Sequence, residues 1–363
     1  MLVCPESKLR LTSVPIEAAV DKLDDGRGLS TRRGLPADLA DVSSVLMRED
    51  GACGFPELGR VPVLMAPEAF VASGSLPAVD VSDPRYAEAY DEDEYYSTGA
   101  ETRMPSTPAE LGDVPLGHLI AAAARSSHSF PEPRGLWIDA IYDCAAQHEA
   151  YRHLAPVAGK RILQLGGIAS HAVKFLLVGA AESWLLTPMI GEARASLRLA
   201  RAAGVEDRLH CVVGIGEELP FEDAAFDAIY SGGSIHHTVT PLSLFECRRV
   251  LRAGGRFAAV DPWRTPFYRI GIAVFGKREP IHCRPLNPAR VAPLYEAFSR
   301  AQVVHHGALT RYPLLVLQKL GVSASLGAAW WINRVDDLAC SMAPGLRRLG
   351  SSVTLLGTVG LTD

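Results

Sequence analysis

Hydrophobic and polar positions along the middle of the chain follow the periods of strands and helices. Ile162, Leu163 and Leu165 are typical of a buried parallel strand, and this strand leads into a tight turn at Gly166. Residues 137–155 carry apolar side chains at helical spacing, which predicts a helix that covers this strand. Near the C-terminus, residues 351–359 predict a late antiparallel strand.

Composition restricts the kind of protein. The 363 residues are enough for two domains, and 48% hydrophobic with 21% charged residues exclude general disorder. The net charge of −5 argues against a nucleic acid as partner, and no apolar run is long enough to span a membrane. Seven scattered cysteines, an odd number, are typical of reduced thiols. We therefore expect a cytoplasmic enzyme that binds neither nucleic acid nor membranes.

Residues 219–263 (LPFEDAAFDAIYSGGSIHHTVTPLSLFECRRVLRAGGRFAAVDPW) combine several turn and strand signals with a glycine pair that fits a helix stop. This run resembles the Rossmann-like class I S-adenosylmethionine (SAM)-dependent methyltransferases, and the resemblance extends over roughly residues 137–262. It implies an α/β fold with a seven-stranded, mostly parallel sheet and helices on both faces. The family's fourth and fifth strands correspond to residues 228–231 and 257–260, and the glycine pair at 254–255 is expected to end the helix between them.

The turn that binds SAM in this family is altered. The family places an acidic residue before G-x-G-x-G, because glycines let backbone amides approach the cofactor. Here Gln164 takes the acidic position, Gly166 is the one glycine in register, and Ile168 and Ser170 replace the other two. The resemblance therefore predicts a methyltransferase whose use of SAM has changed.

Two further cofactor contacts differ from the family pattern. The second strand ends in Thr187 where the family has an acid that bonds the ribose, and the third ends in Gly214-Ile215 where the family has Gly-Asp. Each lost charged hydrogen bond costs about 1.5–3 kcal/mol. We therefore expect a dissociation constant for SAM above about 1 mM, unless Glu192 or Glu217 replaces the lost groups. If SAM is retained, the resemblance assigns it to eight residues: Gly166, Gly167, Ala169, Thr187, Gly214, Ile215, Glu217 and Ser231.

Residues 1–72 form a separate small module. It opens with MLVCPESKLRL, and FPELGRVPVLMAPE lies close to its end. The module resembles the zinc-ribbon-like domains related to tRNA methyltransferase activators, which bind zinc through two C-x-x-C pairs. This chain has Cys4-x-x-Ser7 and Cys53, and two sulfurs do not complete a closed four-ligand site. We expect a degenerate, metal-free α+β module that packs on the enzyme body or on a partner, either another protein or a second copy of the chain.

Residues 73–135 form a connector to a catalytic domain at 136–363, and the connector is rich in Pro, Ser, Gly and acidic residues. The resemblance implies that this connector folds over the active site as a lid, with Tyr95 and Tyr96 as candidate lid residues. The alternative is that both tyrosines pack the connector onto the domain surface. The acidic cluster at 91–94 is interpreted as a solvated face.

The candidate catalytic residues follow the fourth and fifth strands. His236, His237 and Asp261 lie at strand ends, where open α/β sheets bind ligands. Basic residues gather in the chain beyond them: Arg264, Lys277, Arg278, His282, Arg284, His305 and Arg311.

Three interpretations of this basic group remain open. The histidine spacing disfavours a metal, so we predict none. Structural pairing with carbonyls and carboxylates accounts for part of the group. An anion site accounts for another part, because arginine binds phosphate, sulfate or carboxylate with two parallel hydrogen bonds.

The leading functional hypothesis is a methyltransferase-like enzyme of secondary-metabolite or antibiotic biosynthesis that works without a cofactor. It would close a ring by displacing an anionic leaving group within a small, anionic substrate, with His236 or His237 as base. The alternatives are a conventional SAM-dependent methyltransferase of a small metabolite and a non-catalytic scaffold for a partner enzyme.

Overall fold

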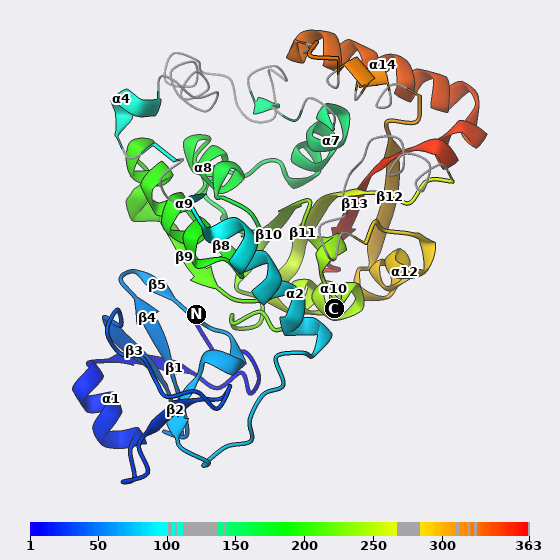
Figure 1. The fold of residues 1–363 in the computed structure, drawn as a ribbon. Helices are drawn as coiled ribbons and strands as arrows, with labels where there is room; N and C mark the ends of the chain where they lie inside the picture. The colour runs from blue at the N-terminus through cyan, green and yellow to red at the C-terminus, as the bar shows by residue number, and fades with distance from the viewer. Residues whose placement is uncertain are drawn as a thin grey trace.

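The computed structural model of the chain contains two sheets, a small one near the N-terminus and a large one in the rest of the chain (Figure 1). The residues that the structure describes are 1–100, 104–105, 107–111, 137–138, 140, 143–266, 284–309, 313–314, 316–317, 320–322 and 325–361. No helix among them is both long and apolar enough to cross a membrane.

The large sheet has seven strands in the order β12-β13-β11-β10-β7-β8-β9. Every strand pair is parallel except the two that β13 makes with β11 and β12. The predicted seven-stranded, mostly parallel sheet with a late antiparallel strand is therefore confirmed. The strands are β7 (Arg161–Leu165), β8 (Glu182–Thr187), β9 (Leu209–Val213), β10 (Phe226–Gly232), β11 (Leu251–Pro262), β12 (Arg300–His306) and β13 (Ser352–Thr358).

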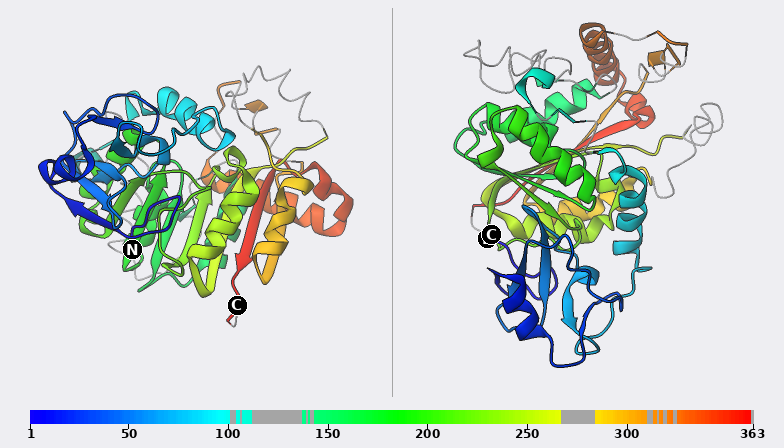
Figure 2. Two further views of the ribbon diagram at one scale, coloured as in Figure 1. Left: turned by 90° about the horizontal axis from the view of Figure 1, so that it is seen from below. Right: turned by 60° about the vertical axis from the view of Figure 1, so that its left-hand side comes forward.

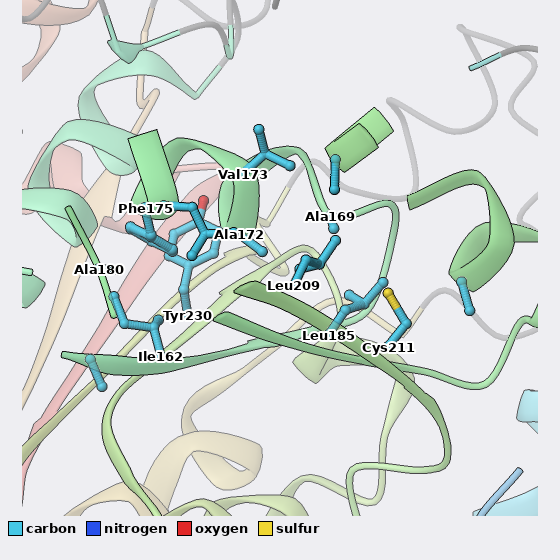
Figure 3. Packing of buried hydrophobic residues seen from close by; sticks show 14 of the residues in the cluster. Ile162, Ala169, Ala172, Val173, Phe175, Ala180, Leu185, Leu209, Cys211 and Tyr230 are labelled. Carbon is cyan, nitrogen blue, oxygen red and sulfur yellow. The ribbon is translucent and has the colours of Figure 1, made fainter. Parts of the chain in front are cut away.

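Helices cover both faces of this sheet (Figure 2). One face packs against α7 (Cys144–Leu154), α8 (Ser170–Leu177) and α9 (Ile190–Ala202), and the other against α10 (Thr240–Val250) and α12 (Pro288–Ala297). Each face has its own apolar core, because residues alternate between the two faces along every strand. Figure 3 shows the first core, where buried side chains of β7, α8 and β10 meet. The remaining elements of this part are η3 (Glu206–Arg208), η4 (Ile235–His237), α14 (Leu326–Met342) and η5 (Pro344–Leu349).

The small sheet is antiparallel and docks on the open edge of the large one. Its elements are β1 (Leu11–Val14), α1 (Ile16–Leu23), β2 (Leu29–Thr31), β3 (Ser44–Arg48), β4 (Gly54–Leu58), β5 (Val61–Pro62), η1 (Ala66–Glu68) and β6 (Phe70–Ala72). The Leu64 amide donates to the Val213 carbonyl at 2.7 Å, next to a parallel bridge between Val63 and Val213. A second hydrogen bond joins the Val3 amide to the Pro220 carbonyl at 3.0 Å. These bonds cover β9, which would otherwise be an exposed edge strand.

The connector forms α2 (Pro84–Glu92), the π-helical turn η2 (Asp93–Ser97) and α4 (Pro108–Leu111) among its described residues. Asp83 caps α2, since its side chain accepts from the Arg85 amide at 2.9 Å, and Pro84 takes the first helical position. Figure 1 shows α2 beside β10 and α10, at the end of the large sheet where the parallel strands finish.

Two predicted boundaries were wrong. The helix expected over 137–155 is α7, which begins at Cys144; before it, the Ala140 amide donates to the Gln147 side chain at 3.0 Å and the Ala140 carbonyl accepts from the Asp143 amide at 3.1 Å. The helix expected to end at residues 254–255 ends at Val250, since Leu251 already has the extended conformation and is buried as the first residue of β11. Gly254 keeps a positive φ of 72°, but it lies inside the strand region rather than at the helix end.

Gly357 in β13 provides a test of how closely the sheet packs. A Cβ atom at this position would lie 2.6–2.8 Å from the Phe298 ring, which stacks on Phe257. We expect Gly357→Ala to lower the free energy of unfolding by about 1–3 kcal/mol through overpacking. Gly327→Ala in α14 is the control, because a Cβ there meets nothing within 4 Å and helical alanine is favoured over glycine. Equal urea midpoints for wild type and Gly357→Ala would contradict this packing.

Candidate active site

A cavity of about 250 Å³ opens where β7, β8 and β10 end, beneath α2. Its walls come from five segments: the turn after β7, the start of α9, the loop after β9, the loop from β10 into η4, and α2 with η2. This is the carboxyl edge of an open α/β sheet, where such folds bind ligands. The described charged residues that line it are Arg85, Glu88, Glu92, Glu192, Glu217 and His237.

The turn after β7 keeps the backbone shape of a glycine-rich loop. Gly166 and Gly167 have φ values of 72° and 67°, and a Cβ on Gly166 would collide with the Ser234 side chain. Glycine is therefore required at 166 on both conformational and steric grounds.

Gln164 holds this turn closed. Its amide nitrogen donates to the Gly166 and Ile168 carbonyls, both at 2.9 Å, and its amide oxygen accepts from the Ala172 amide at 2.8 Å. An ionised carboxylate has no hydrogen to give to either carbonyl. The neutral amide at 164 thus stabilises the turn in a way that the family's acidic residue does not.

Thr187, at the end of β8, is fully buried and lies behind the cavity wall. Its hydroxyl donates to the Glu192 carboxylate at 3.4 Å, and Glu192 itself lines the cavity from the first turn of α9. The resemblance implies an acidic residue at position 187, at the end of β8. In this chain the carboxylate near that point of the cavity belongs to Glu192, five residues further along.

Asp93 and Ser97 of η2 cap the start of α9. The Ile190 amide donates to Asp93 at 3.0 Å, and the Gly191 amide donates to Ser97 at 3.0 Å. These bonds satisfy two helix N-terminal amides from outside the helix. The interpretation of the acidic cluster at 91–94 as a solvated face was wrong for Asp93.

The loop after β9 brings Ile215 and Glu217 to the cavity wall. Glu217 is 7% exposed, and one of its oxygens accepts from the Val239 amide at 2.7 Å. Burial raises the pKa of Glu217 to about 7, against the opposing effect of that hydrogen bond. Its neighbour Glu218 anchors α2, since it accepts from Arg85 at 2.6 Å and from the Tyr86 hydroxyl at 2.8 Å.

His236 and His237 lie on η4, with their ring centres 4.0 Å apart, but they have different partners. His236 Nδ1 lies 2.8 Å from the Asp261 carboxylate, and both residues are buried outside the set that lines the cavity. His237 lines the cavity, and its Nδ1 lies 2.7 Å from Glu88 and 2.9 Å from Glu92.

The two carboxylates beside His237 determine its charge. Burial opposes the charged ring, but the hydrogen bonds that the ring donates to Glu88 and Glu92 outweigh it and raise the pKa of His237 to about 9. At neutral pH this ring is therefore a charged imidazolium, and its Nδ1 donates a hydrogen bond to the carboxylates. It can act as a base only after it has first lost a proton.

The structure separates the predicted basic group. Arg284 is half exposed and donates to Glu88 at 2.8 Å. Arg264 and His305 line a second hollow, which they share with Arg347 and Arg348. Lys277, Arg278, His282 and Arg311 lie outside the described residues.

Of the residues assigned to SAM by resemblance, five line the cavity and three lie behind it. Gly166, Gly167, Gly214, Ile215 and Glu217 are in the wall, whereas Ala169, Thr187 and Ser231 are buried behind it. The assignments themselves stay predictions.

The sequence analysis missed Arg85, Glu88 and Glu92, which come from the connector. One signal for them exists in the chain: Asp83-Pro84 is a helix start, and it places Glu88 and Glu92 four residues apart on one helical face.

Comparisons with known proteins find sequence similarity to methyltransferases. Residues 189–259 match the family model described as a methyltransferase domain. The tRNA U34 carboxymethyltransferase of Geobacter sp. (strain M21) is 32% identical over 193 residues, which are 51% of this chain and 56% of that protein. The demethylmenaquinone methyltransferase of Clavibacter sepedonicus is 34% identical over 116 residues, or 32% and 46% of the two chains. The chain thus spans about half the length of these curated relatives.

Two solved structures illustrate the range of similar folds. The geranyl diphosphate C-methyltransferase of Streptomyces coelicolor A3(2) has a TM-score of 0.47 at 19% identity, with 76% of this chain and 99% of that chain covered. The [4+2]-cyclase SpnF has a TM-score of 0.42 at 16% identity, with 71% and 99% covered.

The segment that matches the methyltransferase domain runs from α9 into β11 of the large sheet. The chain has the Rossmann-like fold of methyltransferases, and this part of its sequence is similar to methyltransferase domains.

Proposed function

We propose that the chain transfers a methyl group from SAM to a small molecule bound in the cavity beneath α2. The observation that carries this proposal is the turn at Gly166 and Gly167, which keeps its left-handed backbone while Glu192 enters the same cavity. A Cβ on Gly167 or Gly233 would meet nothing within 4 Å, so backbone there is open to a ligand. These features fit the methionine and ribose parts of SAM.

The charges around the cavity support a cationic ligand. Three carboxylates (Glu88, Glu92 and Glu192) line it together with Glu217, which is partly protonated at neutral pH because burial raises its pKa to about 7, against Arg85 and His237. A sulfonium carries a positive charge, whereas sulfate or phosphate leaving groups are anions. The described part of the cavity therefore attracts the methyl donor and repels an anionic leaving group.

SAM supplies an electrophilic methyl group when bound, and the chain's own residues would position the acceptor against it. Methyl transfer is an in-line displacement, so holding the two reactants in line accounts for much of the rate. Arg85 and His237 both lie on the side of the cavity under α2, where they can donate to an oxygen of the acceptor. The buried walls of Ile215 and Met189 exclude water from the reacting groups.

A second candidate is the ring closure without SAM that the sequence analysis favoured. It is supported by Ile215 and Ile168, which offer no hydrogen bond to adenine or methionine from their side chains, and by the burial of Thr187. The hollow of Arg264, His305, Arg347 and Arg348 would hold its anionic group, at a place distinct from the cavity.

Calorimetric titration of the purified chain with SAM separates the two candidates. Methyl transfer predicts one site with a dissociation constant in the micromolar range, because Glu192 replaces the missing ribose contact. A dissociation constant above about 1 mM, equivalent to less than about 4 kcal/mol of binding free energy, would favour the second candidate.

Substitution of Glu192 tests its part in that binding. We expect Glu192→Gln to weaken SAM binding by about 1.5–3 kcal/mol, the usual contribution of a hydrogen bond to a charged group. Glu17→Gln is the matched control, since Glu17 also occupies the first turn of a helix, in α1, but is exposed and lies in the N-terminal module. Equal SAM affinities for wild type and Glu192→Gln would remove Glu192 from the site.

Glu217 gives a pH-dependent prediction for stability. Its pKa in the folded chain is about 7, above the 4.5 of a free side chain, so the folded state keeps this proton longer. The resulting stabilisation is complete below about pH 4.5 and is lost as the pH rises through 7.

Glu217→Gln stays neutral and still accepts from the Val239 amide. We therefore expect its free energy of unfolding, measured by urea denaturation, to be close to that of wild type at pH 5 and to exceed it at pH 8 by about 3 kcal/mol. Glu17→Gln serves as the exposed control. A difference between Glu217→Gln and wild type that is constant across this pH range would rule out a raised pKa at Glu217.

A further inference from the structure

We propose that Glu88, Glu92 and His237 form a binding site for a divalent first-row transition-metal ion at the edge of the cavity. Their ligand atoms, two carboxylate oxygens and one imidazole nitrogen, all lie within 4.8 Å of one another. All three side chains line the cavity, and their exposed fractions are 6%, 18% and 19%.

Two separate segments bring these groups together. Glu88 and Glu92 stand one helical turn apart on the same face of α2, and His237 faces them from η4. Both supports are fixed: α2 by Glu218, which accepts from Arg85 and Tyr86, and η4 by the hydrogen bonds of its own residue His236 to Asp261. Rigid elements on two sides are what a metal site needs for defined geometry.

The distances suit an ion after a small movement. Nδ1 of His237 lies 2.7 Å and 2.9 Å from the two carboxylates. With metal–ligand distances of about 2.0–2.2 Å, neighbouring ligand atoms lie roughly 2.8–3.1 Å apart in octahedral sites and roughly 3.3–3.6 Å apart in tetrahedral sites. The two histidine–carboxylate distances therefore need to lengthen by at most several tenths of an ångström, and the oxygens of Glu88 and Glu92 lie within 4.8 Å of each other.

The surrounding charge also favours a cation. Glu217, largely buried, lines the same cavity and senses the charge of Glu88. Among the described residues, the positive groups around the cavity include the half-exposed Arg284 guanidinium, which bonds Glu88, His237 itself, and Arg85, which is paired with Asp83 and Glu218. A divalent ion would add positive charge where the carboxylates of Glu88 and Glu92 converge.

The donor set identifies the class of ion. One imidazole with two carboxylates suits Zn²⁺, Mn²⁺ or Fe²⁺ rather than soft, thiolate-seeking ions. Three protein ligands leave coordination positions open toward the cavity, as in catalytic rather than structural sites. The ligand for those positions is an oxygen donor on the small molecule in the cavity, such as a hydroxyl or carboxylate. Metal binding here does not depend on the proposed use of SAM.

The prediction that the chain holds no metal rested on the spacing of histidines and cysteines and on the two sulfurs of the N-terminal module. It did not consider carboxylates of the connector, and these supply two of the three ligands here. The N-terminal pair of Cys4 and Cys53 is the competing site, because both thiols are buried in one apolar cluster.

Titration of the chelator-treated full-length chain with Co²⁺, followed by visible absorbance, tests the site. We expect saturation at one equivalent with micromolar affinity and competition by Zn²⁺. We expect no sulfur-to-cobalt charge-transfer band, because no thiolate is among the ligands. Cys4→Ser should leave the titration unchanged. Absence of stoichiometric binding, or a charge-transfer band that Cys4→Ser abolishes, would overturn the proposal.

Variants of the ligands complete the test. Glu92→Gln and His237→Gln should each weaken Co²⁺ binding by roughly tenfold or more, since even indirect supports of a metal site contribute 10–100-fold. Glu94→Gln is the control, because Glu94 is an exposed glutamate two residues from Glu92. Thermal melts verify that each variant is folded. Unaltered affinity in both folded ligand variants would also overturn the proposal, and if neither folds, the Cys4→Ser titration and the spectrum decide.

Discussion

The position of α2 across the carboxyl edge of the large sheet determines which charged side chains line the cavity. Glu218 holds the start of the helix through Arg85 and Tyr86, and Asp93 beyond its end caps α9. Between these anchors, Glu88 and Glu92 are brought against His237, although 149 residues separate Glu88 from His237 in the chain. Without this helix the sheet edge would keep Glu192 and Glu217, but it would lose Arg85, Glu88 and Glu92 and with them two of the three ligands of the proposed ion site.

Gln164 shows how a motif change can be misinterpreted from sequence. Compared with a family pattern, a glutamine in place of an acid counts as a lost cofactor contact. In the folded chain the same amide makes three hydrogen bonds that keep the turn of Gly166 in its left-handed shape. The change has altered how the turn is held, and the cavity that the turn borders is retained. A motif residue can therefore be replaced without losing the surface that it helps to form.

The sheet could be predicted from the sequence because its signals are local. Apolar runs such as 162–165 and 351–359 identify buried strands wherever their neighbours lie, and both are strands of the sheet. Boundaries were harder, because the start of α7 depends on one side-chain bond from Gln147 and the end of α10 on burial of Leu251. The site was harder still. Glu88 and Glu92 are ordinary helix-surface residues until a distant histidine faces them, and nothing in their own neighbourhood indicates that contact.

The described residues line two hollows of different charge, one mainly acidic and one basic. The cavity under α2 gathers carboxylates, whereas the hollow beyond β11 and β12 gathers Arg264, His305, Arg347 and Arg348. A single basic cleft, as the sequence suggested, would have placed anion binding and catalysis together. Among the described residues, Arg264 and His305 lie at the second hollow and Arg284 contacts Glu88 at the cavity, so a leaving group held by Arg264 would lie outside the cavity that contains the glycine turn. The two proposals made for the cavity, a sulfonium donor and a metal ion, are compatible with each other, since Glu192 and Glu92 belong to different walls.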